Sequence, residues 1–162
     1  TEDQRFVTHY GFDFEAIKDA FEDAEEGKRV RGGSTISQQT AKNVFLWPSS
    51  TWVRKGFEAG YTVLIETFWS KERIMEVYLN TIEFGKGVYG VEAASNHFFK
   101  KSAARISATE AARLAVVLPN PIKYKANASG GYVVRRQSYA LGQMRNFGGV
   151  LNYHPEIKEP KK

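Results

Sequence analysis

The residues best suited to acid–base chemistry lie in two places in the chain. Glu2 and Asp3 are adjacent, with His9 close by, and Glu58 begins the most apolar stretch of the sequence. A carboxylate becomes a general base when burial raises its pKa toward neutrality. For the first two residues the alternative is a surface acidic pair. For Glu58 it is a helical salt bridge with Arg54 or Lys55. The residues alone leave both alternatives open, and Glu66, on the same predicted helix as Glu58, is expected to be a buried structural partner.

A basic stretch surrounds the second of these positions. The segment from Lys28 to Phe57 contains six of the chain's 23 Lys and Arg residues and none of its 18 Asp and Glu residues. Glycines, hydroxyls, amides and tryptophans lie between the cations. This composition is typical of a pocket for an anionic, partly sugar-like ligand rather than of a solvated helix face.

A glycine turn before a predicted helix could bind part of such a ligand. The sequence Gly32-Gly33-Ser34-Thr35 would direct backbone N–H groups and the positive end of a helix dipole outward, which suits an anion. Lys42 and Arg54 could add positive charge. An ordinary helix cap is the alternative. The turn lacks the GxxxxGK[ST] spacing of a P-loop.

Other kinds of site are excluded by the composition. The chain has no cysteine, so disulfides and cysteine-ligated metals are absent. Its three histidines lie far apart without metal-ligand spacing, so no metal site is predicted. Two carboxylates beside an anion-binding cleft favour transfer of a sugar from a phosphate leaving group. Such a group is already anionic, so it needs cations more than it needs a proton.

The elements that must position these residues are predicted to be helices. No convincing alternating strand pattern is present, so the fold is expected to be all-α within one domain of 162 residues. The second helix of the basic region should be buried at the centre of the domain, because it is apolar almost all round from Phe57 onward. Residues 83–90 are expected to form a glycine-rich loop. The predicted helices cover residues 14–26, 35–45, 51–69, 71–80, 90–99, 108–118 and 132–147.

The ends and charge of the chain give two further expectations. It begins at Thr1 without a methionine, so we expect an N-terminally truncated fragment. It contains no 18-residue apolar run, and the residues leave open a membrane anchor upstream. The family resemblance described below implies that such a transmembrane anchor is missing from this chain. The pI near 9.4 indicates an anionic partner.

Five ordered blocks of the sequence resemble the peptidoglycan glycosyltransferases of glycosyltransferase family 51. The likeness is strongest to the monofunctional biosynthetic enzymes, whose domain also occurs in class A penicillin-binding proteins. It covers nearly the whole chain, and the second block is highly specific. The blocks are Glu2-Asp3-x-x-Phe6-x-x-His9-x-Gly11; Gly32 to Gln39 with Lys42-Asn43; Arg54-Lys55-x-x-Glu58; Lys71-Glu72-x-Ile74 through Tyr78-Leu79-Asn80 to Gly90; and Ser107 to Pro121.

This resemblance implies a lysozyme-like helical lobe with a small flexible jaw lobe, located at the outer, periplasmic face of the bacterial inner membrane. The implied substrate is lipid II, an undecaprenyl-pyrophosphoryl disaccharide-pentapeptide, which is polymerised into glycan strands with inversion at the anomeric carbon. The implied partners are lipid II, the growing strand, the membrane, moenomycin-type inhibitors and other cell-wall synthesis proteins, with no nucleic acid. No cofactor is certain, although a divalent cation (Mg or Mn) is possible.

The resemblance also implies a role for each residue that matches the family pattern. Glu2 is the general base toward the acceptor 4-hydroxyl, and Glu58 assists departure of the lipid pyrophosphate, directly or through a divalent cation. Lys42, Arg54 and Lys55 hold the pyrophosphate. The remaining implied substrate-binding residues are Asp3, His9, Ser34, Thr35, Gln38, Gln39, Asn43 and Arg136. Ser50 is a departure, because many members of the family have arginine there.

Two other functions are weighed against this one. A lysozyme-like hydrolase or lytic transglycosylase would share a helical lobe and a catalytic glutamate, but its polysaccharide substrate has no pyrophosphate for the basic stretch to hold. A non-enzymatic module that binds nucleic acid or an anionic membrane would also be basic. The sequence contains no nucleic-acid-binding motif, and its aromatic residues are predicted to lie mostly in the core.

Overall fold

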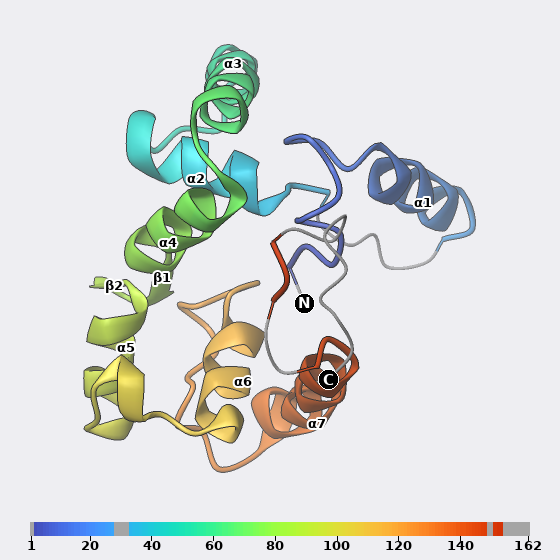
Figure 1. Cartoon of the computed structure of the whole chain (residues 1–162). Coiled ribbons are helices and arrows are strands. Elements are labelled where there is room, and N and C mark those ends of the chain that lie inside the picture. Colours follow the sequence, from blue (N-terminus) through green and yellow to red (C-terminus); the bar gives the residue numbers. More distant parts are fainter. Residues whose placement is uncertain (1, 28–32, 149–150, 154–162) are drawn as a thin grey trace, which may run out of the picture. The chain divides into compact units, whose positions relative to one another are not determined.

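The computed structural model describes residues 2–27, 33–148 and 151–153 (Figure 1). It divides the chain into two compact units. The first, here the α6–α7 unit, comprises residues 1–4 and 76–152, and the second, the α2–α3 unit, comprises residues 5–75 and 153–162. The predicted basic loop at 28–31, Gly32 of the predicted anion-binding turn and His154 lie outside the described residues.

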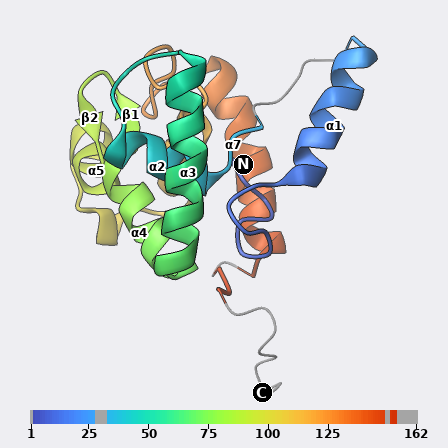
Figure 2. The ribbon, with the colours of Figure 1, turned by 90° about the horizontal axis from the view of Figure 1, so that it is seen from above.

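Three helices of the α2–α3 unit begin at polar caps, close to the starts that the sequence predicts. Helix α1 (Phe14–Glu25) begins after Asp13, whose Oδ1 accepts a hydrogen bond from the backbone N of Ala16 at 2.9 Å. Helix α2 (Ile36–Phe45) begins at Thr35 with a complete capping box, and α3 (Trp52–Phe68) begins at Thr51. Side chains at these positions satisfy N–H groups that have no partner inside the helix. Helix α2 packs against α3 (Figure 2).

Helix α4 (Lys71–Thr81) runs from one unit into the other. It begins after Ser70, whose Oγ accepts a hydrogen bond from the backbone N of Arg73 at 3.2 Å. Ile74 and Tyr78, one helical turn apart, are both buried.

The α6–α7 unit contains the remaining elements. These are β1 (Glu83–Gly85), β2 (Val88–Tyr89), α5 (Val91–Phe99), the 3₁₀ turn η1 (Ala103–Arg105), α6 (Ala108–Val117) and α7 (Gly131–Asn146). Helices α6 and α7 pack against each other (Figure 1), with Leu114, Val117 and Val133 buried. The helices agree with the predicted ones to within a residue or two, and the all-α class is confirmed.

The predicted glycine-rich loop at 83–90 is in part a hairpin, which corrects the expectation that it has no strand. Strands β1 and β2 pair antiparallel, with Glu83 opposite Tyr89 and Gly85 opposite Val88. Gly87 in the turn has a φ of 73°, a conformation that glycine adopts without steric cost. The strands are too short for the alternating pattern that identifies a strand in sequence.

The expectation that α3 is buried at the centre of a domain is wrong. Its apolar side chains lie largely at the surface, with Trp52 91% and Phe68 77% exposed. Its buried positions are instead Glu58, Thr62, Ile65 and Glu66. Helix α3 is therefore amphipathic with a mostly polar buried face. Within the described ranges, no helix combines the length and apolar character needed to span a membrane.

Candidate active site

Glu58 lies between two cations on the first turns of α3. Arg54 Nη1 donates a hydrogen bond to Glu58 Oε2 at 2.7 Å, and Lys55 Nζ donates to Oε1. The spacings of four and three residues place all three side chains on one side of the helix. The Glu58 side chain is only 3% exposed, and a carboxylate buried so fully needs charged partners to offset its lost hydration. The salt bridge that the sequence left open as an alternative is present, and this group of Arg54, Lys55 and Glu58 is called the Glu58 triad below.

The Glu58 triad has one unsatisfied donor, and each carboxylate oxygen already accepts a bond from a cation. Arg54 Nε is buried and has no hydrogen-bond partner among the described residues. A buried donor of this kind costs about 1–3 kcal/mol unless a ligand satisfies it. Both Glu58 oxygens already accept bonds from cations. A divalent cation does not fit there, because it would add positive charge beside Arg54 and Lys55.

The buried face of α3 continues as a polar stripe from Glu58 through Thr62 to Glu66. Thr62 Oγ1 donates to the backbone O of Glu58 at 2.7 Å. Glu66 Oε1 accepts from Ser37 Oγ on α2 and from Lys71 Nζ on α4, the latter at 2.7 Å. This confirms Glu66 as a buried structural partner. The sequence interpretation gave no role to Ser37, Thr62 or Lys71. Polar residues four apart in an otherwise apolar helix were the signal that could have revealed this stripe.

The same network fixes the segment that follows Glu2 and Asp3. Lys71 Nζ also donates to the backbone O of His9 at 2.7 Å and lies 4.7 Å from the centre of the Phe6 ring. Thr35 Oγ1 donates to the backbone O of Gly11 at 2.6 Å. At Gly11 an added Cβ would lie 2.8 Å from Thr62 Cγ2, so only glycine fits against α3.

Thr35 and Gln38 are occupied by internal hydrogen bonds. The Thr35 hydroxyl accepts from the backbone N of Gln38, and Gln38 Oε1 accepts from the backbone N of Thr35 at 2.9 Å. Both residues are buried. The structure therefore gives them the role of a cap, which was the alternative to ligand binding. By contrast, Ser34, Lys42 and Asn43 are exposed, and Gln39 is half-buried.

Glu2 and Asp3 belong to the α6–α7 unit and lie near Tyr78 on α4. Burial raises the pKa of the Tyr78 hydroxyl, and the negative charges of Glu2 and Asp3 raise it further. The carboxylates have this effect because ionisation of the Tyr78 hydroxyl would place a further negative charge beside them. Both acidic residues are half-buried, so neither is a fully solvated surface group.

Arg136 lies in the same unit, on α7. Its guanidinium carbon is 4.4 Å from the centre of the Tyr139 ring, one helical turn away. The Tyr139 hydroxyl accepts a hydrogen bond from Gln4 Nε2 at 3.4 Å. Arg136 and the first sequence block are therefore linked through one tyrosine. The predicted site residues fall into two sets: Glu2, Asp3 and Arg136 in this unit, and the rest in the α2–α3 unit.

Comparisons with known proteins agree with the sequence blocks. The sequence model of a family described as Transglycosylase matches residues 1–145. A protein from Cronobacter sakazakii named biosynthetic peptidoglycan transglycosylase is 60% identical over 148 residues, covering 91% of this chain and 61% of that protein. Proteins of the same name from Citrobacter koseri and Salmonella typhimurium are each 59% identical over 149 residues, which cover 91% of this chain and 62% of each relative. The chain thus spans about three fifths of the length of these relatives.

Proposed function

Because the chain belongs to the transglycosylase family of peptidoglycan glycosyltransferases, we propose that it polymerises lipid II into glycan strands and releases undecaprenyl pyrophosphate. The observation that carries the proposal is the Glu58 triad. It holds two cations in fixed positions at the start of α3, within the basic stretch that the sequence marks as an anion-binding region. Inversion at the anomeric carbon is part of the same proposal.

In this reaction Glu2 is the base. Its carboxylate takes the proton of the acceptor 4-hydroxyl as that oxygen attacks the anomeric carbon of the donor. The bond from the anomeric carbon to the pyrophosphate oxygen breaks, and the electron pair leaves with the pyrophosphate. Asp3 and His9 belong to the same sequence block as Glu2, and their proposed role is to bind substrate beside it. Glu2 is half-buried, so part of the residue is open to the acceptor hydroxyl.

Glu58 acts by holding cations rather than by giving up a proton. As the donor bond breaks, negative charge grows on the pyrophosphate, and preorganised cations stabilise that charge without further reorganisation. Arg54 and Lys55 are held by Glu58, and Lys42 is the further cation proposed to hold the pyrophosphate. Arg136, in the α6–α7 unit, is a proposed substrate-binding residue. The unsatisfied Arg54 Nε supports this role, since a phosphate oxygen would give it a partner.

The helix and turn residues of the second block complete the proposed donor site. Ser34 and Asn43 are exposed, so their side chains can contact a ligand, and the half-buried Gln39 donates from Nε2 to the backbone O of Ser34 at 3.5 Å beside them. Thr35 and Gln38 hold the start of α2 in place through the capping box, which keeps Lys42 on a fixed helix. This order is what preorganised electrostatic stabilisation requires.

We also propose that the protein works at the surface of a membrane, as its substrate requires. The support is the exposed apolar face of α3. Its side chains line a cavity of about 480 Å³, and they recur at helical spacing along one stripe. The lining residues are Val53, Gly56, Phe57, Gly60, Tyr61 and Leu64. Such an exposed apolar stripe on a basic protein suits an anionic lipid surface. Moenomycin-type inhibitors and other cell-wall synthesis proteins remain proposed partners.

The test is a polymerisation assay with fluorescent lipid II in detergent or liposomes, read by gel electrophoresis. We expect a ladder of glycan strands that moenomycin abolishes. A parallel incubation with purified sacculi addresses the hydrolase alternative, for which soluble fragments would be released. Release of such fragments together with no polymer would overturn the proposal. Steeply salt-dependent DNA binding, with no response to lipid II, would instead favour the basic binding module.

A further inference from the structure

A second cavity lies in the α6–α7 unit, and none of its lining residues belongs to the sequence-predicted site. It has a volume of about 280 Å³ and is formed by the β1–β2 hairpin, the end of α5 and the loop between α6 and α7. The lining residues are Gly85, Lys86, Val88, His97, Phe98, Pro121, Ile122, Lys125 and Asn127. None of the proposed reaction steps uses them.

The polar part of this lining is cationic. Lys86 and Lys125 come from separate segments, and no carboxylate forms an ion pair with either among the residues that the structure describes. The nearest acidic residue along the hairpin, Glu83, instead accepts a hydrogen bond from the backbone N of Gly87 at 2.9 Å. Two lysines that line one cavity give it positive charge, which favours binding of an anion. The side chains of His97 and Asn127 add hydrogen-bonding groups to the same wall.

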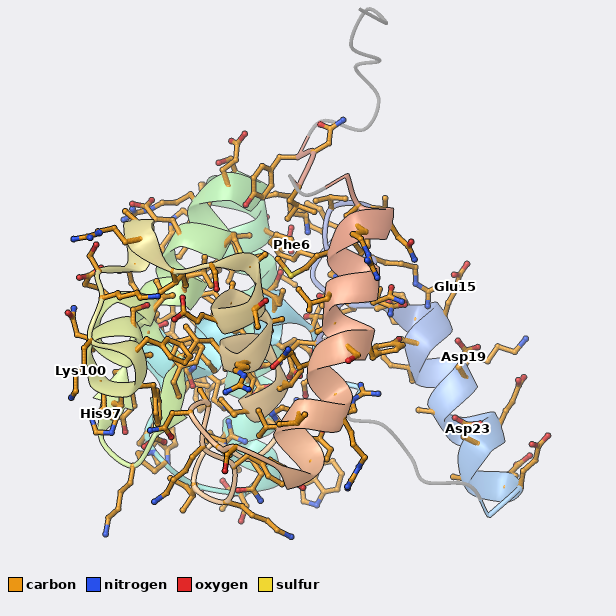
Figure 3. The ribbon with its side chains drawn as sticks, turned by 90° about the horizontal axis from the view of Figure 1, so that it is seen from below. Phe6, Glu15, Asp19, Asp23, His97 and Lys100 are labelled. Atoms are coloured by element: carbon orange, nitrogen blue, oxygen red, sulfur yellow. The ribbon has the colours of Figure 1, made fainter. Side chains whose placement is uncertain are left out.

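The rest of the lining is apolar. Ile122 is 58% exposed at this cavity, and Val88, Phe98 and Pro121 complete the surface. Apolar walls with a few convergent polar groups are typical of small-ligand pockets. His97 lies at the end of α5 near Lys100 (Figure 3), whose Nζ donates to the backbone O of His97 at 3.3 Å, and both residues are exposed. The cavity therefore lies at the surface, where a ligand can reach it.

We propose that this cavity binds a terminal carboxylate that carries a small apolar side chain, such as the end of a peptide. The lysines would pair with the carboxylate, and the apolar wall would cover the side chain next to it. Resting on the proposed function, we identify the ligand as a stem peptide of lipid II or of the growing strand. A phosphate is a poorer match, because it offers no apolar group for Ile122 and Phe98 to cover.

The test is a titration of the ¹⁵N-labelled 162-residue chain with N-acetyl-D-alanyl-D-alanine, followed by NMR. We expect saturable shifts of the Gly85, Val88 and Asn127 amides, and none with the C-terminal amide of the same dipeptide. Lys86→Gln combined with Lys125→Gln should weaken binding at least tenfold. The control Arg105→Gln removes an exposed positive charge that does not line the cavity, and it should leave binding unchanged.

Several outcomes would overturn the proposal. One is that the dipeptide amide or inorganic phosphate binds as tightly as the dipeptide acid. Another is that the double lysine variant binds the dipeptide with unchanged affinity while its NMR spectrum shows that it is folded. Because the titration needs no catalysis, it is separate from the proposed activity. A chain that polymerises lipid II but binds no dipeptide contradicts this inference alone, and a chain that binds the dipeptide but makes no polymer contradicts the proposed function alone.

Discussion

Lys71 at the start of α4 and Glu66 near the end of α3 form an ion pair, with Lys71 Nζ 2.7 Å from Glu66 Oε1 and both side chains largely buried. The pair links the end of α3 to the start of α4. Lys71 also bonds to the backbone O of His9 and contacts the Phe6 ring, so it holds in place the segment that follows the proposed base. One buried cation thus connects the packing of α3 and α4 to the first sequence block.

Replacing Lys71 by methionine should destabilise the fold by about 3–5 kcal/mol, because it leaves Glu66 buried without its counter-charge. Urea denaturation measures this. Adding Glu66→Gln to Lys71→Met should recover part of the lost stability, because it removes the buried charge that has lost its partner. The matched control is Lys18→Met, which breaks the exposed pair with Glu22 and should cost no more than about 1 kcal/mol. Equal effects of the two lysine changes would contradict the importance of the buried pair.

Gly11→Ala should destabilise the protein more than Gly27→Ala. Both glycines have positive φ, 77° and 69°, so both alanines carry a backbone penalty of about 1–2 kcal/mol. Only at Gly11 does the new Cβ meet another group, Thr62 Cγ2 at 2.8 Å, which adds about 1–3 kcal/mol of overpacking. Thermal unfolding of both variants checks the difference. Similar melting temperatures would show that the first sequence block is not packed tightly against α3.

Asp13 should make stability depend on pH in the acid range. Burial raises the pKa of its carboxyl group, but hydrogen bonds from Ala16 N and Arg5, and the positive charge of Arg5, together hold the pKa below the ordinary value of 3.8. A lowered folded-state pKa stabilises the protein above pH 3.8, and this contribution disappears as the pH falls through the folded value.

Asp13→Asn keeps the cap and removes the charge, so the variant tests that dependence. It should cost about 1 kcal/mol or less at pH 7, and the difference from the unchanged protein should shrink as the pH is lowered below 3.8. Urea denaturation at several pH values measures it. Asp19→Asn, at an exposed position along the acidic side of α1 (Figure 3), is the control and should show little difference at any pH. A difference for Asp13→Asn that persists at low pH would exclude the charge as its cause.

Glu2→Gln should lower polymerisation of lipid II by about 10²–10⁴-fold while the fold survives, because an amide cannot accept the acceptor's proton. Glu58→Gln should also lower the rate, but through the loss of charge that holds Arg54 and Lys55. The two variants differ in stability: Glu58→Gln breaks buried ion pairs and should lower the melting temperature more. Normal polymerisation by Glu2→Gln would remove it from the role of base.

Trp52→Ser combined with Leu64→Ser should weaken binding to vesicles of anionic lipid at least severalfold, because it removes exposed apolar area from the α3 stripe. Vesicle cosedimentation measures this. The control pair is Tyr89→Ser and Ile122→Ser, exposed apolar residues of the other unit, which should leave binding unchanged. Equal losses in both pairs would show that apolar exposure in general, and not α3, drives the binding.

Local chemistry decided most helix ends, and the sequence predicts those well. Asp13, Thr35, Thr51 and Ser107 are caps whose side chains need only their own helix as partner. The pairing of Glu58 with Arg54 and Lys55 follows from the same short spacings. The hairpin at 83–90 could not be predicted with equal ease, because its two strands are too short to show a period.

The sequence by itself determined the all-α class, the caps, the local charge pairs and, through the ordered blocks, the family. Only the tertiary structure decided which face of α3 is buried. Its apolar residues predicted a central helix, yet the structure buries a polar face that ends at Glu66, because Ser37 and Lys71 from other helices supply the partners of Glu66. Burial of a polar group depends on groups distant in sequence that satisfy it, and periodicity within one helix does not contain that information.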